Sequence, residues 1–186
     1  ALADAAVSYY GKLDGAINFS GIESSSPIAD ISLEVLQQNC DVHLIGTTLF
    51  IKHMTARMTH GGSVVTTSSQ TAVLAPPGLA AYAGTKAGAD HIVRIAAVEY
   101  GAQNIRVNSL SPGFTPSAMT EGFLSIPNIE QAFINEIPLG KLPSTDDMAN
   151  AALWLLSDES FMTGRMLDIS GGQTLRRIPS ATEMGF

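Results

Sequence analysis

Tyr82 and Lys86 are the residues of this sequence whose types and spacing most favour chemistry. Both lie in a stretch of helical character, 80–100, and residues four apart on a helix share one face, with their Cβ atoms about 5–6 Å apart. A free tyrosine has a pKa of about 10 and is a poor acid or base at neutral pH. Since a neighbouring ammonium favours the phenolate, the pair can form a proton donor and acceptor. The alternative is a surface tyrosine beside a solvated lysine.

A run of hydroxyl side chains, 67–69, ends a Val- and Thr-rich stretch that is typical of a strand. The hydroxyl of Ser69, fixed at such a strand end, can donate to the carbonyl oxygen of a substrate and hold that oxygen near Tyr82. The alternative is simple turn chemistry, because Ser and Thr at strand ends often bond to the local backbone.

Short apolar stretches alternate with longer helical ones, and no repeat or linker interrupts them. This alternation predicts one α/β domain, 1–186, with a parallel sheet, right-handed crossovers and helices on both faces. Ligands of such sheets bind outside the carboxyl ends of the strands, here the polar segments 18–21, 67–70 and 111–117. The expected strands are 13–19, 63–68, 104–110 and 166–169, and the expected helices are 1–11, 33–58, 80–100 and one that begins after Ser144.

Local signals mark several ends of these elements. Gly11 is expected to end the first helix, Ser32 to cap the second, and the Ser-Thr-Asp-Asp run at 144–147 is typical of a capping box. The second helix carries an apolar stripe at steps of three and four residues, which we expect to face the core. The stripe consists of Leu36, Cys40, His43, Thr47, Phe50 and Met54.

The composition excludes several classes of function. The chain has 186 residues, 45% of them hydrophobic, and a net charge of −7, so we expect neither a nucleic-acid partner nor an anionic-membrane surface. The longest unbroken apolar run, 151–156, is too short to cross a bilayer. A single cysteine, Cys40, excludes an internal disulfide and a cysteine-built zinc site and suits a reducing compartment. We therefore expect a cytoplasmic protein without a catalytic metal.

The order Ser69…Tyr82-x-x-x-Lys86, set within Gly-Gly-Ser-Val-Val-Thr-Thr-Ser-Ser and Ala-Tyr-Ala-Gly-Thr-Lys-Ala-Gly, resembles the short-chain dehydrogenase/reductase family. Three further segments look like that family's strand 4 and its turn, its strand 6 with a Pro-Gly turn, and its final strand. The resemblance therefore spans nearly the whole chain. The three segments are Leu13-Asp-Gly-Ala-Ile-Asn-Phe-Ser-Gly-Ile, Ile105-Arg-Val-Asn-Ser-Leu-Ser-Pro-Gly and Gly164-Arg-Met-Leu-Asp-Ile-Ser-Gly-Gly.

This resemblance implies an NAD- or NADP-dependent oxidoreductase that interconverts a small alcohol and its carbonyl compound. It implies that Tyr82 is the general acid and base, that Lys86 lowers the pKa of Tyr82 and holds the nicotinamide ribose, and that Ser69 orients the substrate oxygen. The cofactor contacts that it implies are Asn18, Ser20, Gly21, Thr67, Tyr82, Lys86, Pro112, Gly113, Thr115 and Ser117, and the substrate contacts are Ser69, Gln70, Tyr82 and Phe114.

The segment 114–138 matches the variable part of the family that covers the substrate, and its apolar side chains suit that position. An amphipathic helix that only closes the core is the alternative.

The largest departure from the family is that its Gly-rich turn, Thr-Gly-x-x-x-Gly-x-Gly, occurs nowhere in 1–186. The resemblance therefore implies an incomplete Rossmann-type, doubly wound parallel sheet, with family strands 4–7 present and strands 1–3 absent. The residue that selects NAD or NADP would lie in the absent part. A non-catalytic remnant or partner subunit, unable to bind a dinucleotide, is the alternative function.

A second departure is His43, which stands where the family has its catalytic Asn in a Val-Asn-Leu-x-Gly pattern. An imidazole can donate and accept protons, so His43 could replace the proton relay credited to that Asn. The alternative is a core histidine whose ring is satisfied by the backbone. Smaller departures are Phe19 and Ser20 in the turn after strand 4 and Ser170 before the final Gly-Gly. The remaining histidines show no metal-ligand pattern.

The family pairs its subunits through the helices that correspond to 33–58 and 80–100, so the resemblance implies a homodimer or homotetramer. In the family's strand order, 13–19 becomes an edge strand when strands 1–3 are absent, and this stretch has no lysine in its apolar part to prevent pairing with another chain. We therefore expect that these 186 residues alone do not persist as a soluble monomer.

Overall fold

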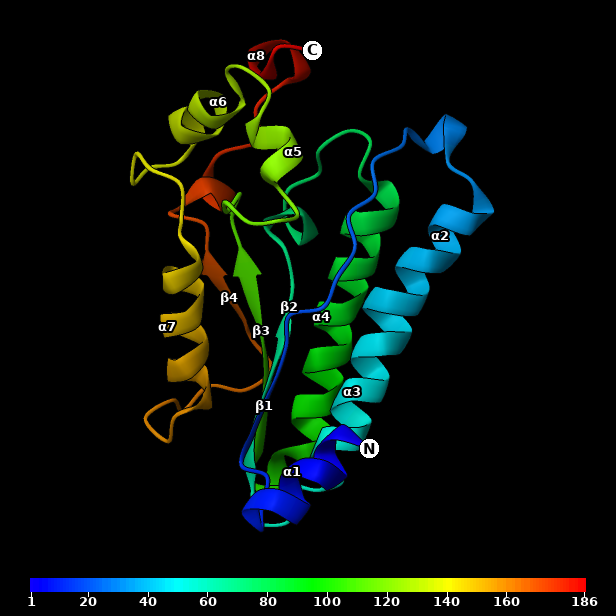
Figure 1. Cartoon of the computed structure of the whole chain (residues 1–186), viewed down its shortest axis with the longest axis vertical. Coiled ribbons are helices and arrows are strands. Elements are labelled where there is room, and N and C mark those ends of the chain that lie inside the picture. The colour runs from blue at the N-terminus through cyan, green and yellow to red at the C-terminus, as the bar shows by residue number, and fades with distance from the viewer.

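Four parallel strands form the centre of the protein in a computed structural model that describes residues 1–186 (Figure 1). The strands lie side by side in chain order, so each connection crosses over a face of the sheet. Asn18 pairs with Thr66, Thr67 with Leu110, and Pro112 with Ile169, which brings the carboxyl ends of neighbouring strands together. The strands are β1 (Gly15–Asn18), β2 (Gly62–Thr67), β3 (Ile105–Pro112) and β4 (Met166–Ile169).

All four strands were predicted from the sequence, and β1 is the one that differs most in length. It pairs on one side only, at the edge of the sheet, and ends before Phe19, whose side chain is exposed. The central strands β2 and β3 are buried on both faces, as expected for a parallel sheet covered by helices.

Helices cover both faces of the sheet, which confirms the predicted doubly wound α/β arrangement (Figure 1). Helices α3 and α4 pack on one face, where they form an apolar core with β2 and β3, and α7 packs on the other face over a second core. None of the helices combines the length and the apolar character that a membrane span requires. The helices are α1 (Leu2–Tyr10), α2 (Leu33–Asn39), α3 (Gly46–Thr55), α4 (Ala80–Tyr100), α5 (Glu121–Leu124), α6 (Ile129–Glu136), α7 (Thr145–Leu156) and α8 (Ala181–Met184).

The predicted helix ends are confirmed where a side chain or a glycine sets them. Gly11 ends α1 in the left-handed region, with φ at 80°, and Ser32 accepts a hydrogen bond from the N–H of Val35 at the start of α2. The capping box at the start of α7 joins Ser144 and Asp147 in both directions. These ends are local in origin, which is why the sequence predicts them.

The long helix predicted at 33–58 is interrupted by a π-helical turn, η2 (Cys40–Ile45), between α2 and α3. A π turn adds a residue to the helical repeat, so it rotates the side chains of the preceding helix relative to those of the next one. The prediction that the apolar stripe faces the core is therefore correct for His43 and for the stripe residues of α3. It is wrong for Leu36, which is 37% exposed. Asn39 is buried instead, four residues before His43.

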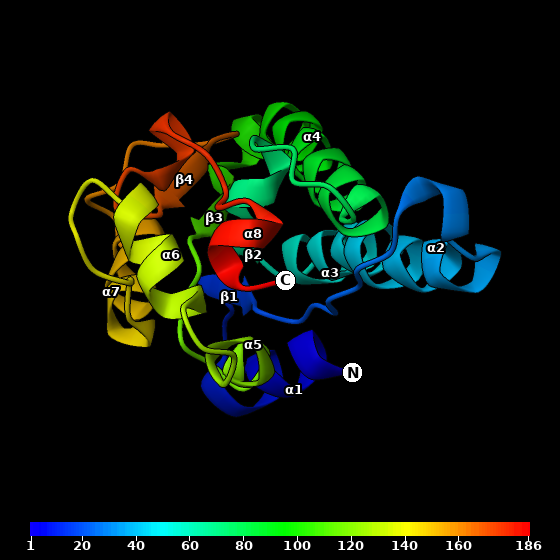
Figure 2. The same ribbon diagram turned by 90° about the horizontal axis from the view of Figure 1, so that it is seen from above.

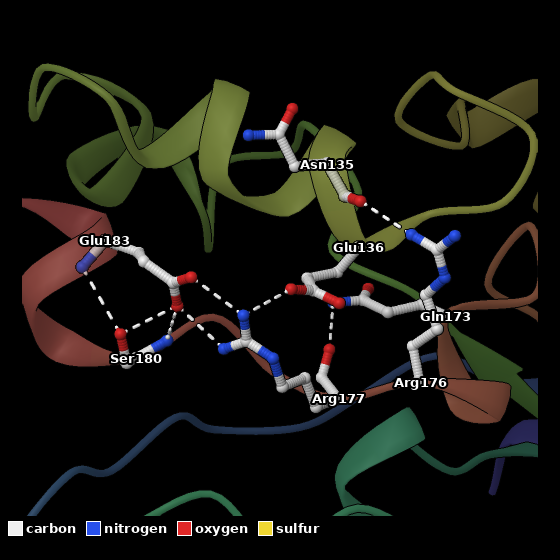
Figure 3. A network of polar contacts seen from close by, with 7 residues as sticks. All are labelled: Asn135, Glu136, Gln173, Arg176, Arg177, Ser180 and Glu183. Atoms are coloured by element: carbon white, nitrogen blue, oxygen red, sulfur yellow. Dashed lines mark hydrogen bonds and ion pairs between the residues drawn. The ribbon is translucent and has the colours of Figure 1, made fainter.

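Helices α5, α6 and α8 lie over the carboxyl end of the sheet (Figures 1 and 2). Arg177 joins two of them, because its guanidinium lies 2.7 Å from carboxylate oxygens of both Glu136 in α6 and Glu183 in α8 (Figure 3). Arg176 donates to the carbonyl oxygen of Asn135 at 2.9 Å. These contacts tie the C-terminal segment to the part of the chain predicted to cover a substrate.

Candidate active site

Helix α4 places Tyr82 and Lys86 on one face, as their spacing predicts. The Nζ atom of Lys86 lies 5.8 Å from the centroid of the Tyr82 ring. Lys86 is only 3% exposed, and Tyr82 is half-buried. The interpretation of a solvated lysine beside a surface tyrosine is therefore wrong for this pair.

The ammonium of Lys86 is held by the end of β2. Its Nζ donates to the carbonyl oxygen of Thr67 at 2.8 Å. Burial lowers the pKa of Lys86 to about 8, and the charge of Asp90 opposes this change. An ammonium has three N–H donors and the chain supplies one acceptor, so two donors remain for a ligand.

The phenol of Tyr82 is protonated at neutral pH in the protein without a ligand. Burial raises its pKa, a hydrogen bond with Ser69 lowers it, and the negative charge of Glu23 raises it. A phenol in this state is a proton donor, and it becomes an acceptor when a nearby positive charge stabilises the phenolate.

Ser69 combines turn chemistry with a place in the site. It lies two residues beyond the end of β2, and its Oγ accepts hydrogen bonds from the backbone N–H of Thr71 at 3.2 Å and from the Thr71 hydroxyl at 2.9 Å. These two bonds fix the oxygen, while the Ser69 proton is free to be donated to Tyr82 or to a ligand oxygen. The next residue, Gln70, is buried, and its Oε1 has no partner within the chain.

The turn after β1 packs directly against this group. Thr67 Oγ1 donates to the carbonyl oxygen of Asn18 at 2.7 Å, and the Asn18 side chain accepts from the N–H of Ser20 at 2.9 Å. A Cβ atom on Gly21 would lie 3.4 Å from Nζ of Lys86, so the backbone at Gly21 borders the ammonium closely. The structure therefore brings the predicted residues of β1, β2 and α4 together.

His43 lies behind Tyr82, where the π turn directs it into the interior. It is 2% exposed, and its ring meets the Tyr82 ring edge-on with centroids 5.4 Å apart. Nε2 accepts from the N–H of Ile22 at 3.2 Å, and Nδ1 lies 2.9 Å from Thr85 Oγ1. The Thr85 hydroxyl uses its proton to donate to the carbonyl oxygen of Ala81, so its oxygen must accept from Nδ1. The ring proton of His43 is therefore assigned to Nδ1, and Nε2 is the acceptor.

Burial lowers the pKa of His43 to about 4, with the nearby charge of Lys86 acting in the same direction. An unfolded chain takes up this proton near the ordinary pKa of 6.5. The contribution of His43 to stability is therefore complete above about pH 6.5 and is lost as the pH falls from there to about 4.

We expect this loss to amount to about 3 kcal/mol in the free energy of unfolding. The measurement is urea unfolding of the protein and of His43→Asn at several pH values across this range, because the variant subtracts all other titrating groups. His53→Asn, which makes the same substitution at an exposed position of α3, is the matched control. A difference between protein and His43→Asn that stays constant with pH would contradict the assignment.

The predicted residues after β3 form a separate group at the same end of the sheet. The N–H of Gly113 donates to the carbonyl oxygen of Ile169 at 3.1 Å, and Thr115 Oγ1 donates to that of Gly113 at 3.0 Å. The Phe114 ring stacks on Phe133 of α6, with centroids 4.0 Å apart.

These residues make no hydrogen bond to Ser69, Tyr82 or Lys86 within the chain. Pro112, the last residue of β3, is half-buried, whereas Ser117 is exposed and its N–H donates to Thr120 Oγ1 at 2.9 Å. No group of three or more His, Cys, Asp or Glu side chains is placed to hold a metal ion.

Sequence reasoning missed two residues that the structure adds to this site. Thr85 fixes the tautomer of His43, and Asp90 lies buried one turn beyond Lys86. Asp90 has a signal in the sequence, since it continues the four-residue steps from Tyr82 and so falls on the same buried helix face. Thr85 has none, because its contact depends on the π turn in a different helix.

Known proteins are similar to this chain over most of its length. A family model described as "Enoyl-(Acyl carrier protein) reductase" matches residues 1–174. The chain is 36% identical over 171 residues to a 2,5-dichloro-2,5-cyclohexadiene-1,4-diol dehydrogenase of Sphingobium indicum, covering 89% of this chain and 68% of that protein.

Two solved structures are also similar. A short-chain type dehydrogenase/reductase from Mycobacterium ulcerans superposes with a TM-score of 0.93 at 33% identity, over 99% of this chain and 68% of that one. A 7α-hydroxysteroid dehydrogenase complexed with NADH and 7-oxo glycochenodeoxycholic acid superposes with a TM-score of 0.86 at 32% identity, over 92% of this chain and 68% of that one. The chain thus belongs to the short-chain dehydrogenase/reductase family of oxidoreductases.

Proposed function

We propose that the protein transfers hydride between a nicotinamide cofactor and an alcohol or ketone, with Ser69, Tyr82 and Lys86 as the proton-transfer site. The observation that carries this proposal is the buried Lys86 ammonium beside the half-buried Tyr82 phenol, because a fold does not require a buried cation at this place. Family membership supplies the reaction class.

In alcohol oxidation, Ser69 holds the substrate oxygen and the Tyr82 phenolate takes the proton from the hydroxyl. Burial raises the pKa of Tyr82 and so disfavours this phenolate. We assign its stabilisation to the Lys86 ammonium, whose Nζ lies 5.8 Å from the centroid of the Tyr82 ring. In ketone reduction, Tyr82 donates its proton to the carbonyl oxygen. When bound, the nicotinamide cofactor accepts or supplies the hydride.

The residues present fit the nicotinamide-ribose part of the cofactor. The two unpartnered N–H donors of Lys86 suit ribose hydroxyls, and the absence of a side chain at Gly21 leaves backbone next to the ammonium. We further propose that Pro112, Gly113, Thr115 and Ser117 lie along the nicotinamide side. The cofactor that we propose is NAD or NADP, because these residues are assigned to the nicotinamide side, on which the two cofactors are identical.

For the substrate we propose a secondary alcohol carried on an alicyclic ring, or the matching ketone. The diol dehydrogenase of Sphingobium indicum and the 7α-hydroxysteroid dehydrogenase are both named for ring alcohols. In this chain the half-buried Phe114, which stacks on the buried Phe133, offers an apolar side chain in the segment 114–138, which suits a ring without charge.

The test is a turnover assay with NAD⁺ and NADP⁺ separately, using cyclohexanol and cyclopentanol beside linear secondary alcohols of similar size. We expect reduced cofactor to form fastest with the ring alcohols. Thermal stabilisation by each cofactor gives an independent measure of binding. Cofactor binding without turnover of any of the alcohols would contradict catalysis. The absence of both cofactor binding and turnover would favour the non-catalytic alternative.

His43 gives a second prediction within this function, because it stands where the family's catalytic Asn does. If the imidazole passes protons toward Lys86, His43→Ala should slow turnover by about tenfold or more, and His43→Asn should recover most of the loss. Both rates are measured at equal cofactor saturation, with melting temperatures as the check on packing. Equal rates for the protein and both variants would eliminate the relay.

We also propose that β1–β4 correspond to family strands 4–7. In addition, we propose that the protein is cytoplasmic and forms a homodimer or a homotetramer. Helix α4 lies beside the continuous helical run of α2, η2 and α3, and exposed apolar side chains on these helices support a subunit contact there (Figure 1). Light scattering should give two or four times the chain mass of 19.5 kDa. A monodisperse monomer would contradict the contact. The exposed apolar side chains on α2, α3 and α4 that would form this contact are Leu33, Leu49, Ile95 and Val98.

A further inference from the structure

Asp90 is a buried acidic residue for which the proposed reaction has no direct use. It is 7% exposed, and it follows Tyr82 and Lys86 at steps of four residues along α4. The three side chains therefore lie on one helix face, with Lys86 between the phenol and the carboxylate. A buried carboxylate is costly unless hydrogen bonds and opposite charges compensate it, so its partners indicate its role.

Each carboxylate oxygen of Asp90 accepts a hydrogen bond from a serine of a different strand segment. The hydroxyl of Ser68 donates to Oδ2 at 2.5 Å, and the hydroxyl of Ser109 donates to Oδ1 at 2.6 Å. Both serines are buried. Such short O–H···O distances are typical of bonds to an ionised carboxylate. Asp90 thus links α4 to β3 and to the residue that precedes Ser69.

The charged groups near Asp90 complete the arrangement. Burial raises the pKa of Asp90 above its ordinary value, and the two hydroxyls, Arg94 and Lys86 only partly oppose this rise. Asp90 in turn opposes the fall in the pKa of Lys86. On the other side, Lys86 faces a neutral His43 and the Tyr82 phenol, which has Glu23 near it.

We propose that Asp90 is a positioning residue of the active site, whose carboxylate keeps the buried Lys86 charged and fixes the end of β2 that carries Ser69. This inference rests on the proposed function, since it assigns the purpose of the Lys86 charge. A structural carboxylate would need only its two serine bonds. A positioning carboxylate must also change the protonation of Lys86, which can be measured without any turnover.

The experiment is an NMR titration of the lysine side chains in uniformly ¹³C-labelled protein. The chain has four lysines, Lys12, Lys52, Lys86 and Lys141, so few signals overlap, and loss of one signal in Lys86→Met assigns Lys86. We expect the Lys86 midpoint near pH 8 to fall by about one pH unit in Asp90→Asn. If Asp90→Asn does not fold, Asp90→Ser makes the same charge change with a smaller polar side chain.

The matched control is Glu99→Gln, which removes one carboxylate from an exposed position of the same helix and should leave the Lys86 midpoint unchanged. In turnover assays Asp90→Asn should lower kcat at about pH 8 by about tenfold, with a smaller change in KM. A Lys86 midpoint that does not move would overturn the role of Asp90, whatever the activity. Turnover that survives in Tyr82→Phe would instead overturn the proposed function, and the titration would still decide on Asp90.

Discussion

Tyr82→Phe should lower turnover by about 10²–10⁴-fold in both directions while the affinity for the cofactor stays nearly unchanged. The substitution removes only the phenolic oxygen. The ring keeps its edge-on contact with His43, and Lys86 keeps its hydrogen bond to Thr67, so the packing of the site is preserved. The measurement is kcat and KM for alcohol oxidation and ketone reduction, together with the dissociation constant of the cofactor.

Tyr100→Phe is the matched control, since Tyr100 is half-buried at the far end of the same helix. It should leave turnover unchanged. A Tyr82→Phe variant that retains turnover within a few-fold of the unaltered protein would show that Tyr82 does not transfer the proton, and the assignment of the site would then fail.

Lys86→Met should lose both turnover and cofactor binding, with turnover down by about 10³-fold or more. In the proposed function the ammonium has two tasks, because it lies 5.8 Å from the centroid of the Tyr82 ring, where it would stabilise the phenolate, and it has two N–H donors left for a ligand. Methionine keeps a similar length and removes the charge. Kinetics at several cofactor concentrations and direct cofactor titration separate the two losses.

The stability of Lys86→Met distinguishes a functional lysine from a structural one. Burial lowers the pKa of Lys86 to about 8, so the folded protein disfavours its ammonium. Removing that charge should offset the lost bond to the Thr67 carbonyl, and we expect a nearly unchanged melting temperature. Lys52→Met, at an exposed position of α3, should change neither activity nor stability. A strongly destabilised Lys86→Met with normal cofactor affinity would argue for a structural role.

Much of the architecture could be predicted from the sequence because its causes are local. Helix α4 occupies the predicted range, 80–100, and a four-residue step on any helix brings Tyr82 and Lys86 to one face. Gly11 and the capping box at 144–147 act on their own backbone neighbours, so the ends that they set were predicted correctly. Alternating strands and helices likewise indicated the parallel sheet and its two covered faces.

Other features depend on contacts between distant segments. A regular helical repeat predicted Leu36 in the core, but the π turn η2 rotates this part of the helix and buries Asn39 in its place. The same turn directs His43 to the N–H of Ile22 and to Thr85, which fixes its tautomer. No periodicity in the sequence marks such a turn, because it forms where packing compensates a less favourable hydrogen-bond geometry.

The electrostatics of the site also arise only on folding. The types and spacing of Tyr82, Lys86 and Asp90 are visible in the sequence, but their burial and hydrogen bonds are not. The hydroxyls that hold Asp90 come from Ser68 and Ser109, which lie 22 and 19 residues away along the chain and meet it only across the folded sheet. The order of residues thus establishes which groups share a helix face, whereas their protonation is set by the folded structure, because a pKa depends on the solvent and charges that folding removes or brings near.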